Sequence, residues 1–361
     1  MIWGGLVSFG IASILCPMKQ GPVTLSSLAR LLNVHVSTVS RVLNGSDEDA
    51  KSAAAPETVQ RIRDLAKQLN YRPNPNAIGL RTQRTRTIGV LVPQLSDIVV
   101  AVIYEGIDAA AVHANYQTFV SNTQDIPARQ RELGESALAR RVDGIMFADA
   151  RLDDPYFIDE IAKRGIPMVL VSRRLGQHCS VTCDDFEGGR LAADHLVGLG
   201  HRDIAVLAGQ AHASTGVDRT AGFVARCEEL GVDIDKAWRP TSPFNTEAGR
   251  SVGERLLAGS RKPTAFFAVN DFLAIGLMGA LRDYGMTPGS DVAVVGYNDT
   301  PVAADLPISL TSVRSPMHQM GYRGAELLIE QMGGGRSESE RLMPELVVRQ
   351  SSGVASNRGH M

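Results

Sequence analysis

The chain has 361 residues, of which 44% are hydrophobic and 21% are charged, and its formal net charge is −2. This length predicts two or three domains, and the composition is close to that of an average soluble globular protein. The overall charge excludes a chain that is basic throughout, and no apolar run reaches the ~20 residues that a membrane-spanning helix needs.

The first 17 residues, MIWGGLVSFGIASILCP, form an apolar stretch with no Lys or Arg before Lys19. The stretch lacks the positive region of a secretory signal and is too short to span a bilayer. We interpret it as an upstream extension, with Met18 as the native start; weak membrane association is the alternative.

Charge is distributed unevenly along the chain. From Met18 to Arg86 there are 11 Lys and Arg against 5 Asp and Glu, whereas the remainder carries 26 basic and 34 acidic residues. A basic N-terminal module joined to an acidic body indicates a polyanionic partner for the module only.

Three helices are predicted in this basic module. Residues 25–32 carry apolar side chains on one face after Thr24, a suitable N-cap, and a break follows at Asn33, which tolerates the left-handed conformation. A second helix is predicted over 36–43 and a third over 56–70, with Pro56 in its first turn.

The short break between the first two helices is typical of a helix-turn-helix, whose second helix enters the DNA major groove. Val36, Ser37 and Thr38 would reach base edges, and Arg41 would contact guanine or phosphate. We add Asn44, at the end of this helix, to the predicted major-groove set. The alternative is an ordinary helical hairpin.

A linker, NYRPNPNAIGLRTQRTRT, follows the third helix. Asn74 is a good N-cap, and residues 76–80 could form about one and a half helical turns, too short to be stable alone. We therefore expect this hinge to fold only when another surface holds it.

From Thr87 onward, apolar runs alternate with amphipathic stretches such as 99–113 and 191–199. The runs are TIGVLV, QTFVSN, DGIMFA, PMVLVS, IAVLAG, TAFFAV and VAVVGYN. Apolar strands separated by helices predict parallel sheets covered on both faces. Since there are more units than one sheet usually needs, we expect two α/β lobes with a ligand cleft between them at the strand ends.

The sequence contains none of the catalytic or metal-binding motifs that we searched for. The four cysteines form neither a disulfide framework nor a paired zinc spacing; Cys179 and Cys183 are spaced so that they could touch on a helix. The chain lacks G-x-x-x-x-G-K-[ST], G-x-S-x-G and H-E-x-x-H, and no dinucleotide fingerprint follows a strand. We predict no catalytic residue, no metal, no cofactor and no enzyme activity.

The segment VTLSSLARLLNVHVSTVSRVLNG resembles the DNA-binding signature of the lactose- and galactose-repressor family of bacterial transcription regulators. LNYRPNPNAIGLRTQRTRTIGV resembles the family's hinge; RRVDGIM, DDFEGGRLAADHLVGLGHRDIAVLAG, NDFLAIGLMGAL and DVAVVGYND resemble its body. The resemblance runs from about Val23 to Gly353. It implies paired hinge helices in the operator's minor groove, where Asn74, Ala77 and Leu80 would act, with Leu80 as a wedge between base pairs.

The resemblance also implies an effector site in the cleft. Arg219 matches the family's effector-binding arginine, Phe244 a ring-stacking position and Asn270 a ligand contact. The implied effector-binding residues are Asp97, Val99, Ser172, Arg173, Arg219, Phe244, Asn270, Asn298 and Asp299.

Four departures from the family pattern stand out. Ser172 replaces a common Asp, and Asn298 replaces one of two usual acids, so the cleft loses two negative charges and gains room for an anionic effector. Asn33 stands where the family often has Gly. The acidic run GSDEDAKSAAAPETV is longer than the usual turn, and we expect a solvated loop there, which would weaken DNA binding if it lay near phosphates.

The sequence therefore predicts an all-α helix-turn-helix domain followed by a two-lobed α/β body like that of periplasmic binding proteins. The expected segments are the extension 1–17, the DNA-binding domain 18–71, the hinge 72–86, the body 87–353 and the tail 354–361. Within the body, one lobe would contain about 87–184 and 315–340, and the other about 185–314 and 341–353.

The predicted function is transcriptional regulation by a cytoplasmic homodimeric repressor. It would bind a pseudo-palindromic double-stranded operator, since two-fold protein symmetry requires matching half-sites. A small effector, a sugar or sugar derivative, would modulate operator affinity, and no membrane takes part. The alternative is a two-lobed solute-binding protein of the periplasmic type.

Overall fold

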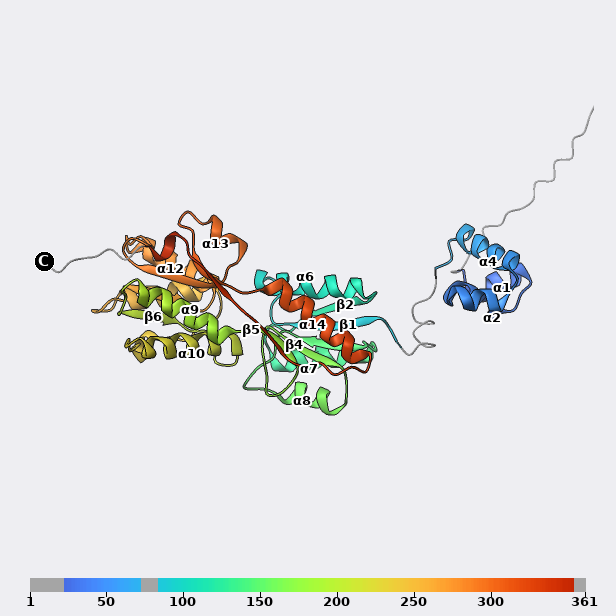
Figure 1. The fold of residues 1–361 in the computed structure, drawn as a ribbon, viewed down its shortest axis with the longest axis horizontal. Coiled ribbons are helices and arrows are strands. Elements are labelled where there is room, and N and C mark those ends of the chain that lie inside the picture. Colours follow the sequence, from blue (N-terminus) through green and yellow to red (C-terminus); the bar gives the residue numbers. More distant parts are fainter. Residues whose placement is uncertain (1–22, 73–83, 354–361) are drawn as a thin grey trace, which may run out of the picture. The chain divides into compact units, whose positions relative to one another are not determined.

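A computed structural model describes residues 23–72 and 84–353. The chain divides into two compact units, Met1–Thr85 and Arg86–Met361, each with its own hydrophobic core (Figure 1). In both described ranges, no helix is long and apolar enough to cross a membrane.

The first unit is a bundle of short helices around a small core that includes the fully buried Leu28, Val39 and Ile62. Its helices are α1 (Leu25–Leu32), α2 (Val36–Asn44), α3 (Asp47–Ala53) and α4 (Pro56–Gln68). Thr24 caps α1 as predicted, because its Oγ1 accepts the Ser27 amide at 3.2 Å. Asn33 is left-handed with φ 53°, which lets the chain turn sharply into α2.

The acidic run between α2 and α4 corrects one expectation, because it forms the helix α3 rather than a solvated loop. Ser46 and Asp49 make a reciprocal capping box, and the acidic first turn suits the positive end of the helix dipole. Ala50 is 1% exposed and packs in the core of this unit. The helix is therefore an integral part of the bundle, although its acidic side chains remain exposed.

The second unit contains two lobes, each built on one sheet. The first lobe has an all-parallel sheet in the order β10-β5-β4-β3-β1-β2. Its strands are β1 (Thr87–Val92), β2 (Gln117–Asn122), β3 (Gly144–Phe147), β4 (Met168–Val171), β5 (Ser180–Cys183) and β10 (Glu340–Leu342). Its helices are α6 (Ile98–His113), α7 (Pro127–Ala139), α8 (Tyr156–Lys163) and α14 (Met317–Met332). One core lies between the sheet and α6 with α14, and a separate one lies under α7 and α8.

The second lobe has the sheet order β11-β9-β8-β7-β6, with only β11 antiparallel among its described pairings. Its strands are β6 (Ile204–Leu207), β7 (Ala265–Ala268), β8 (Ala293–Asn298), β9 (Thr311–Arg314) and β11 (Glu345–Val347). Its helices are α9 (Asp185–Gly198), α10 (Ser214–Glu229), α11 (Thr246–Leu257), α12 (Asp271–Asp283) and α13 (Pro301–Asp305). The fold class predicted from the sequence is confirmed.

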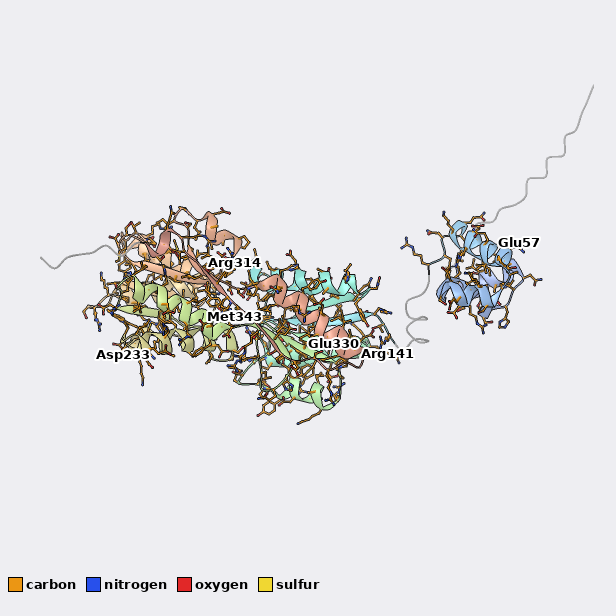
Figure 2. All side chains as sticks on the ribbon, viewed as in Figure 1. Glu57, Arg141, Asp233, Arg314, Glu330 and Met343 are labelled. Atoms are coloured by element: carbon orange, nitrogen blue, oxygen red, sulfur yellow. The ribbon has the colours of Figure 1, made fainter. Side chains whose placement is uncertain are left out.

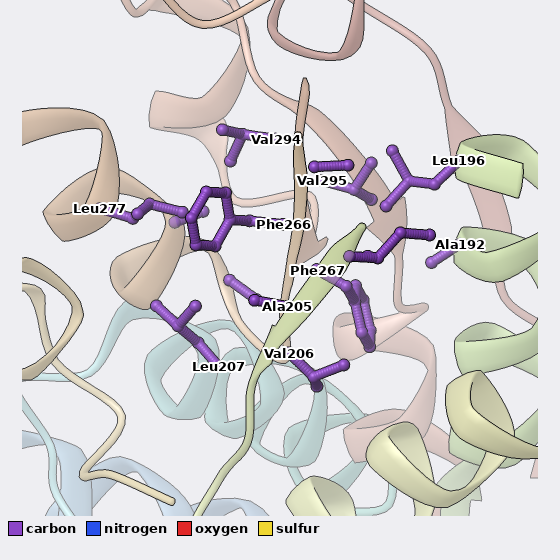
Figure 3. Close-up of a cluster of buried hydrophobic side chains, with 14 of the residues drawn as sticks. Ala192, Leu196, Ala205, Val206, Leu207, Phe266, Phe267, Leu277, Val294 and Val295 are labelled. Carbon is purple, nitrogen blue, oxygen red and sulfur yellow. The ribbon is translucent and has the colours of Figure 1, made fainter. Parts of the chain in front are cut away.

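Side chains of β7 point alternately to the two faces of the sheet, which explains why every residue of this strand is apolar. Phe266 points toward Leu277 of α12, whereas Phe267 lies on the opposite side of the strand (Figure 3), where its ring stacks on Phe223 of α10 at a centroid distance of 4.7 Å. Because successive strand residues face opposite sides, a sheet covered by helices on both faces requires apolar residues at every position.

Cys179 and Cys183 do not share a helix, which corrects the helical contact considered above. Cys183 ends β5, and burial raises the pKa of its thiol to about 11. Cys179, Cys183 and Cys227 are all free thiols. β5 escaped sequence prediction because its Ser and Thr residues interrupt the apolar pattern.

The chain crosses between the lobes after β5, after β9 and between β10 and β11. Arg314 and Met343 mark two of these crossings in Figure 2. Such parallel connections allow one lobe to rotate on the other while both sheets stay intact. The cleft lies between the lobes at the ends of their strands, because residues from both lobes line it.

Candidate functional site

The residues of α2 that pack in the core determine which of its residues face solvent. Val39 and Val42 are buried in the first unit's core, so Val36, Ser37 and Arg41 project into solvent, while Thr38 is half-buried. His35 caps the helix: its Nδ1 accepts the Ser37 amide at 3.3 Å. Small side chains at the start of the helix leave its backbone accessible to a close partner.

Asn44 lies apart from this exposed face. It is half-buried and its side chain hydrogen-bonds to Tyr71. Because Tyr71 lies at the start of the linker, this contact joins the end of α2 to the segment that leaves the unit. The hinge residues Asn74, Ala77 and Leu80 lie outside the described residues.

A cavity of about 60 Å³ between the two lobes brings together most of the predicted effector residues. The first lobe contributes Asp97, Val99, Ser172 and Arg173, and the second contributes Arg219, Phe244, Asn270 and Asn298. The remaining lining residues are Pro93, Val100, Ile103, Ala148 and Thr215.

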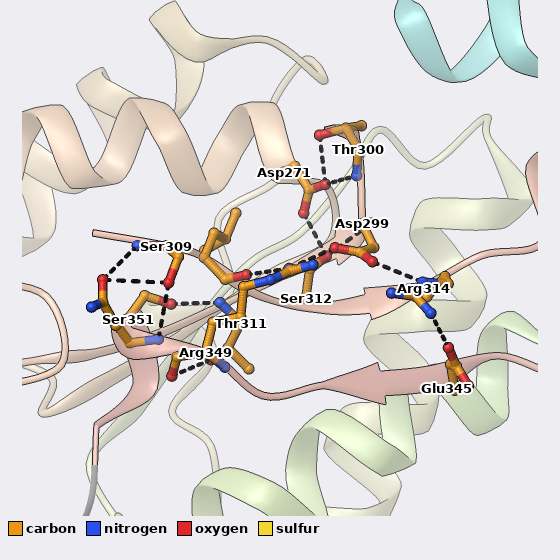
Figure 4. Close-up of polar contacts among 12 residues, drawn as sticks. Asp271, Asp299, Thr300, Ser309, Thr311, Ser312, Arg314, Glu345, Arg349 and Ser351 are labelled. Carbon is orange, nitrogen blue, oxygen red and sulfur yellow. Dashed lines mark hydrogen bonds and ion pairs between the residues drawn. The ribbon is translucent and has the colours of Figure 1, made fainter. Parts of the chain in front are cut away.

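Asp299 does not line this cavity. Its carboxylate lies 2.6 Å from Arg349 Nη1 and accepts Arg314 Nε at 2.8 Å (Figure 4). The structure therefore separates Asp299 from the other residues of the predicted effector set and pairs it with two arginines of the second lobe.

Arg219 is held within the second lobe. It is 4% exposed; its Nε donates to Asp185 at 2.8 Å, its Nη1 donates to the Val269 carbonyl at 2.8 Å, and its guanidinium lies 3.8 Å from the Tyr297 ring centroid. Burial raises the pKa of Asp185, and the adjacent guanidinium opposes that rise.

Two glycines set the position of Arg219. A Cβ on Gly189 of α9 would collide with the Arg219 carbonyl oxygen, and one on Gly222 of α10 would collide with the Phe186 carbonyl oxygen. Only glycine allows these two helices to approach so closely, and the approach brings Arg219 beside Asp185 at the start of α9.

Asn270 and Phe244 form a connected pair. Asn270 caps α12 by accepting the Leu273 amide at 2.9 Å, and its Nδ2 donates to the Phe244 carbonyl at 3.2 Å. The Phe244 ring packs against Gly209 and Gly216, where any Cβ would press on the ring. The ring is thereby fixed beside the cavity.

Ser172 and Asn298, the two departures from the family pattern that lie in the cleft, both have an unusual backbone conformation. Their φ angles are 67° and 100°, in the region that non-glycine residues seldom adopt. Asn298 is 3% exposed, and its Oδ1 has no hydrogen-bond partner within the described residues. Strained backbone and an unsatisfied buried acceptor are typical of ligand sites.

Asp97 supplies an acceptor from the first lobe. Its Oδ1 accepts the Val99 amide at 2.9 Å at the start of α6. Burial raises the pKa of Asp97, while the Val99 amide and the charges of Arg173 and Arg219 oppose the rise.

Sequence reasoning missed the carboxylate that faces Arg173. Arg173 donates two hydrogen bonds to Asp125, at 2.8 and 2.9 Å, and His212 Nε2 of the second lobe lies 3.0 Å from Asp125 Oδ2. A second interlobe contact joins Arg174 to Asp218 through two bonds of 2.8 and 2.5 Å. Asp125 follows a parallel strand, which is a signal for a cleft position; His212 and Asp218 carried no such signal.

These pairs change the charge expected in the cleft. Both guanidinium groups that line the cavity, those of Arg173 and Arg219, already face a carboxylate. The missing acids at Ser172 and Asn298 therefore do not leave an unbalanced cation for an anionic ligand.

Residues 24–74 match the family model for bacterial regulatory proteins of the lacI family, and residues 193–352 match the model for a periplasmic binding protein-like domain. The regulator CelR of Thermobifida fusca is 33% identical over 341 residues, which cover 91% of this chain and 98% of CelR. The chain belongs to the lacI family.

Other lacI-family members are similar to this chain over most of its length. The repressor PurR of Vibrio parahaemolyticus is 29% identical and covers 90% of this chain and 97% of its own length. The structure of the Lac repressor dimer bound to operator and an anti-inducer has a TM-score of 0.84 at 26% identity, covering 92% of this chain and all of that one. A CelR–cellobiose complex gives a TM-score of 0.69 at 30% identity, covering 91% of this chain and 99% of that one.

The function predicted from the sequence is confirmed at the level of the lacI family. The chain is a DNA-binding transcriptional regulator of the repressor type with an effector-binding body. The match over residues 24–74 sets aside the alternative of a solute-binding protein of the periplasmic type.

Proposed function

We propose that this regulator binds an uncharged carbohydrate in the interlobe cavity and that occupancy of the cavity changes its affinity for operator DNA. The observation that carries the effector class is the pairing of Arg173 with Asp125 and of Arg219 with Asp185. With both cations neutralised, a ligand rich in hydroxyl groups fits better than an anion.

The roles of the lining residues follow from their chemistry. Asn298 Oδ1 and the Asp97 carboxylate accept hydrogen bonds from sugar hydroxyls, and the free edge of Arg219 donates to them. Phe244 stacks on the apolar face of a sugar ring. The cellobiose in the CelR complex is a neutral sugar and supports the same class for this protein.

Thermal unfolding with neutral sugars and with their phosphates tests the effector class. We expect a neutral sugar to raise the melting temperature, and Phe244→Ala to reduce that rise, whereas Asp153→Asn, which alters an exposed carboxylate outside the cavity lining, should respond like the wild type. Stabilisation by the phosphates alone would contradict the proposal.

On the DNA side, Val36, Ser37, Thr38 and Arg41 read the major groove, with Asn44 holding the end of α2. Residues 72–86 act as the hinge, with Asn74, Ala77 and Leu80 in the minor groove. A short helix there has little stability of its own, so a small change in lobe position can form or melt it. We expect Ala77→Gly to weaken operator binding and to leave effector affinity unchanged; equal loss of both would contradict this role.

The working assembly is a cytoplasmic homodimer on a pseudo-palindromic operator, without enzyme activity. An apolar groove of about 470 Å³ beside α12, lined by Ile275, Met278, Met286, Leu306 and Ile308 among others, is a suitable contact surface for a second copy. The dimeric Lac repressor structure supports this assembly. Native mass spectrometry of Met278→Glu should give a larger monomer fraction than the wild type; an unchanged dimer would exclude this surface.

A further inference from the structure

A second, larger chamber adjoins the effector cavity. Its volume is about 530 Å³, and it shares Pro93, Asp97, Arg173 and Phe244 with the smaller cavity. The two spaces are therefore neighbours along one cleft, with the Phe244 ring at their boundary. Apart from these shared residues, no lining residue of the chamber belongs to the effector set predicted from the sequence.

Six uncharged polar residues and two phenylalanine rings, Phe244 and Phe272, line the chamber. Its titratable lining residues are Asp97, Asp125, Arg151, Arg173 and His212. The uncharged polar residues are Gln94, Ser96, Gln124, Gln210, Asn245 and Thr246. Amide and hydroxyl groups can donate and accept hydrogen bonds, and aromatic rings offer a flat apolar surface. This combination suits a second sugar ring better than a purely apolar or an ionic group.

The basic side chains of the chamber all contact Asp125. Arg173 donates to both of its carboxylate oxygens, His212 lies 3.0 Å away, and Arg151 Nη1 lies 4.0 Å from Oδ1 and donates to the Asp125 carbonyl at 2.9 Å. Arg151 has a second partner in Asp153, at 2.8 Å. Asp125 thus balances the charge of Arg173, and Asp125 and Asp153 together balance that of Arg151.

We propose that the outer chamber is a second subsite for an uncharged glycosyl unit of the effector, and that Asp125 is the specificity-determining residue that closes this subsite to anions. The effector is then a carbohydrate of two or more rings. The inference rests on the proposed function of the cleft, but the charge role of Asp125 can be tested without knowledge of the sugar.

Replacement of Asp125 by Asn should convert the chamber into an anion site. Arg173 and His212 would lose their shared carboxylate, and inorganic phosphate could take its place. Asp149 is a second carboxylate whose pKa feels the charges of Arg173 and Asp125; it is 1% exposed, and burial raises its pKa. The double variant Asp125→Asn/Asp149→Asn therefore tests whether Asp149 takes the place of Asp125 beside Arg173.

The measurement is the melting temperature of the full chain in inorganic phosphate, compared with sodium chloride at equal ionic strength. We expect phosphate to stabilise Asp125→Asn, and the double variant at least as much, beyond its effect on the wild type. The matched control is Asp153→Asn, which also removes a carboxylate from Arg151 but leaves Asp125 in place. Equal phosphate responses in Asp125→Asn and Asp153→Asn would overturn the role of Asp125.

The wild-type chain provides a test that does not depend on the folding of a variant. Calorimetric titrations compare glucose with cellobiose and with maltose, galactose with lactose, and each with glucose 6-phosphate. We expect a disaccharide to bind about tenfold tighter than its monosaccharide, and Phe272→Ala to remove this advantage. Equal affinities within every pair, or preferred binding of the phosphate, would overturn the second subsite.

Failure of the proposed effector class and failure of the second subsite give different results. If no neutral sugar binds, the carbohydrate class proposed for the whole cleft fails and the subsite fails with it. If monosaccharides bind as tightly as disaccharides, the proposed function stands and only the second subsite is lost.

Discussion

The exposed face of α2 and the interlobe cleft use their polar residues in opposite ways. On α2, Val36 is 38% exposed and Arg41 stands in solvent, whereas in the cleft Arg219 and Asn270 are 4% and 3% exposed. A side chain in solvent is available to a partner and contributes little to folding. A buried charged side chain must be paired before a ligand arrives, so the same residue serves both stability and recognition.

The largest expected effect comes from breaking a buried pair in the cleft. Arg219→Ala leaves Asp185 buried without its counter-charge and should lower the free energy of unfolding by about 3–5 kcal/mol. Urea unfolding at pH 7 measures this change. If the midpoint stays at the wild-type value, the cleft does not couple stability to recognition in the way described above.

The buried carboxyl of Asp271 should make the stability of the second lobe depend on pH. It is buried behind the strand ends and accepts hydrogen bonds from the Thr300 amide, Thr300 Oγ1 and Ser312 Oγ (Figure 4). Burial raises its pKa from 3.8 to about 6, although these hydrogen bonds oppose the rise.

The sign of the pH dependence follows from this raised pKa. Stability from Asp271 is fully present below pH 3.8 and is lost as the pH rises through about 6. Asp271→Asn lacks this titration. The wild type should therefore lose roughly 2–3 kcal/mol relative to the variant between pH 4 and 7. Parallel unfolding curves at each pH measure the difference, and a constant difference across the range would contradict the assignment.

Arg41→Ala tests whether an exposed side chain of α2 contributes to DNA binding without contributing to stability. The free energy of unfolding should stay within about 0.5 kcal/mol of the wild type, while operator binding weakens by about 1–3 kcal/mol. Fluorescence anisotropy with a duplex selected from a random pool gives the affinity, and repeats at several salt concentrations show whether Arg41 contacts phosphate. A large loss of stability would show that Arg41 is a structural residue instead.

The smallest effect concerns the helix that the sequence did not reveal. Ser46→Ala removes the cap of α3 and should destabilise the first unit by about 1 kcal/mol. Ser52→Ala, inside the same helix, is the matched control and should be neutral or slightly stabilising. Thermal unfolding of the two variants side by side checks this; equal melting temperatures would contradict a structural role for the cap.

The helices and the apolar strands were predictable because each depends on local information. The break at Asn33, the cap at Thr24 and the apolar run that became β7 were all identified by residue type and spacing. α3 was not, because an acidic, alanine-rich run reads as a loop unless the Ser46–Asp49 capping box is recognised. β5 and β9 carry Ser and Thr between apolar residues and gave too weak a signal.

For the cleft, the sequence by itself determined which residue types stand at the strand ends, and the family resemblance selected Arg219, Phe244 and Asn270 among them. Only the tertiary structure decided how their charges are balanced. Asp125 faces His212 from the other lobe, 87 positions away, and Asp299 turns to Arg314 and Arg349 instead of the cavity. Helices and strands follow from short-range periodicity, whereas the pairing of a buried charge depends on segments that only the folded chain brings together.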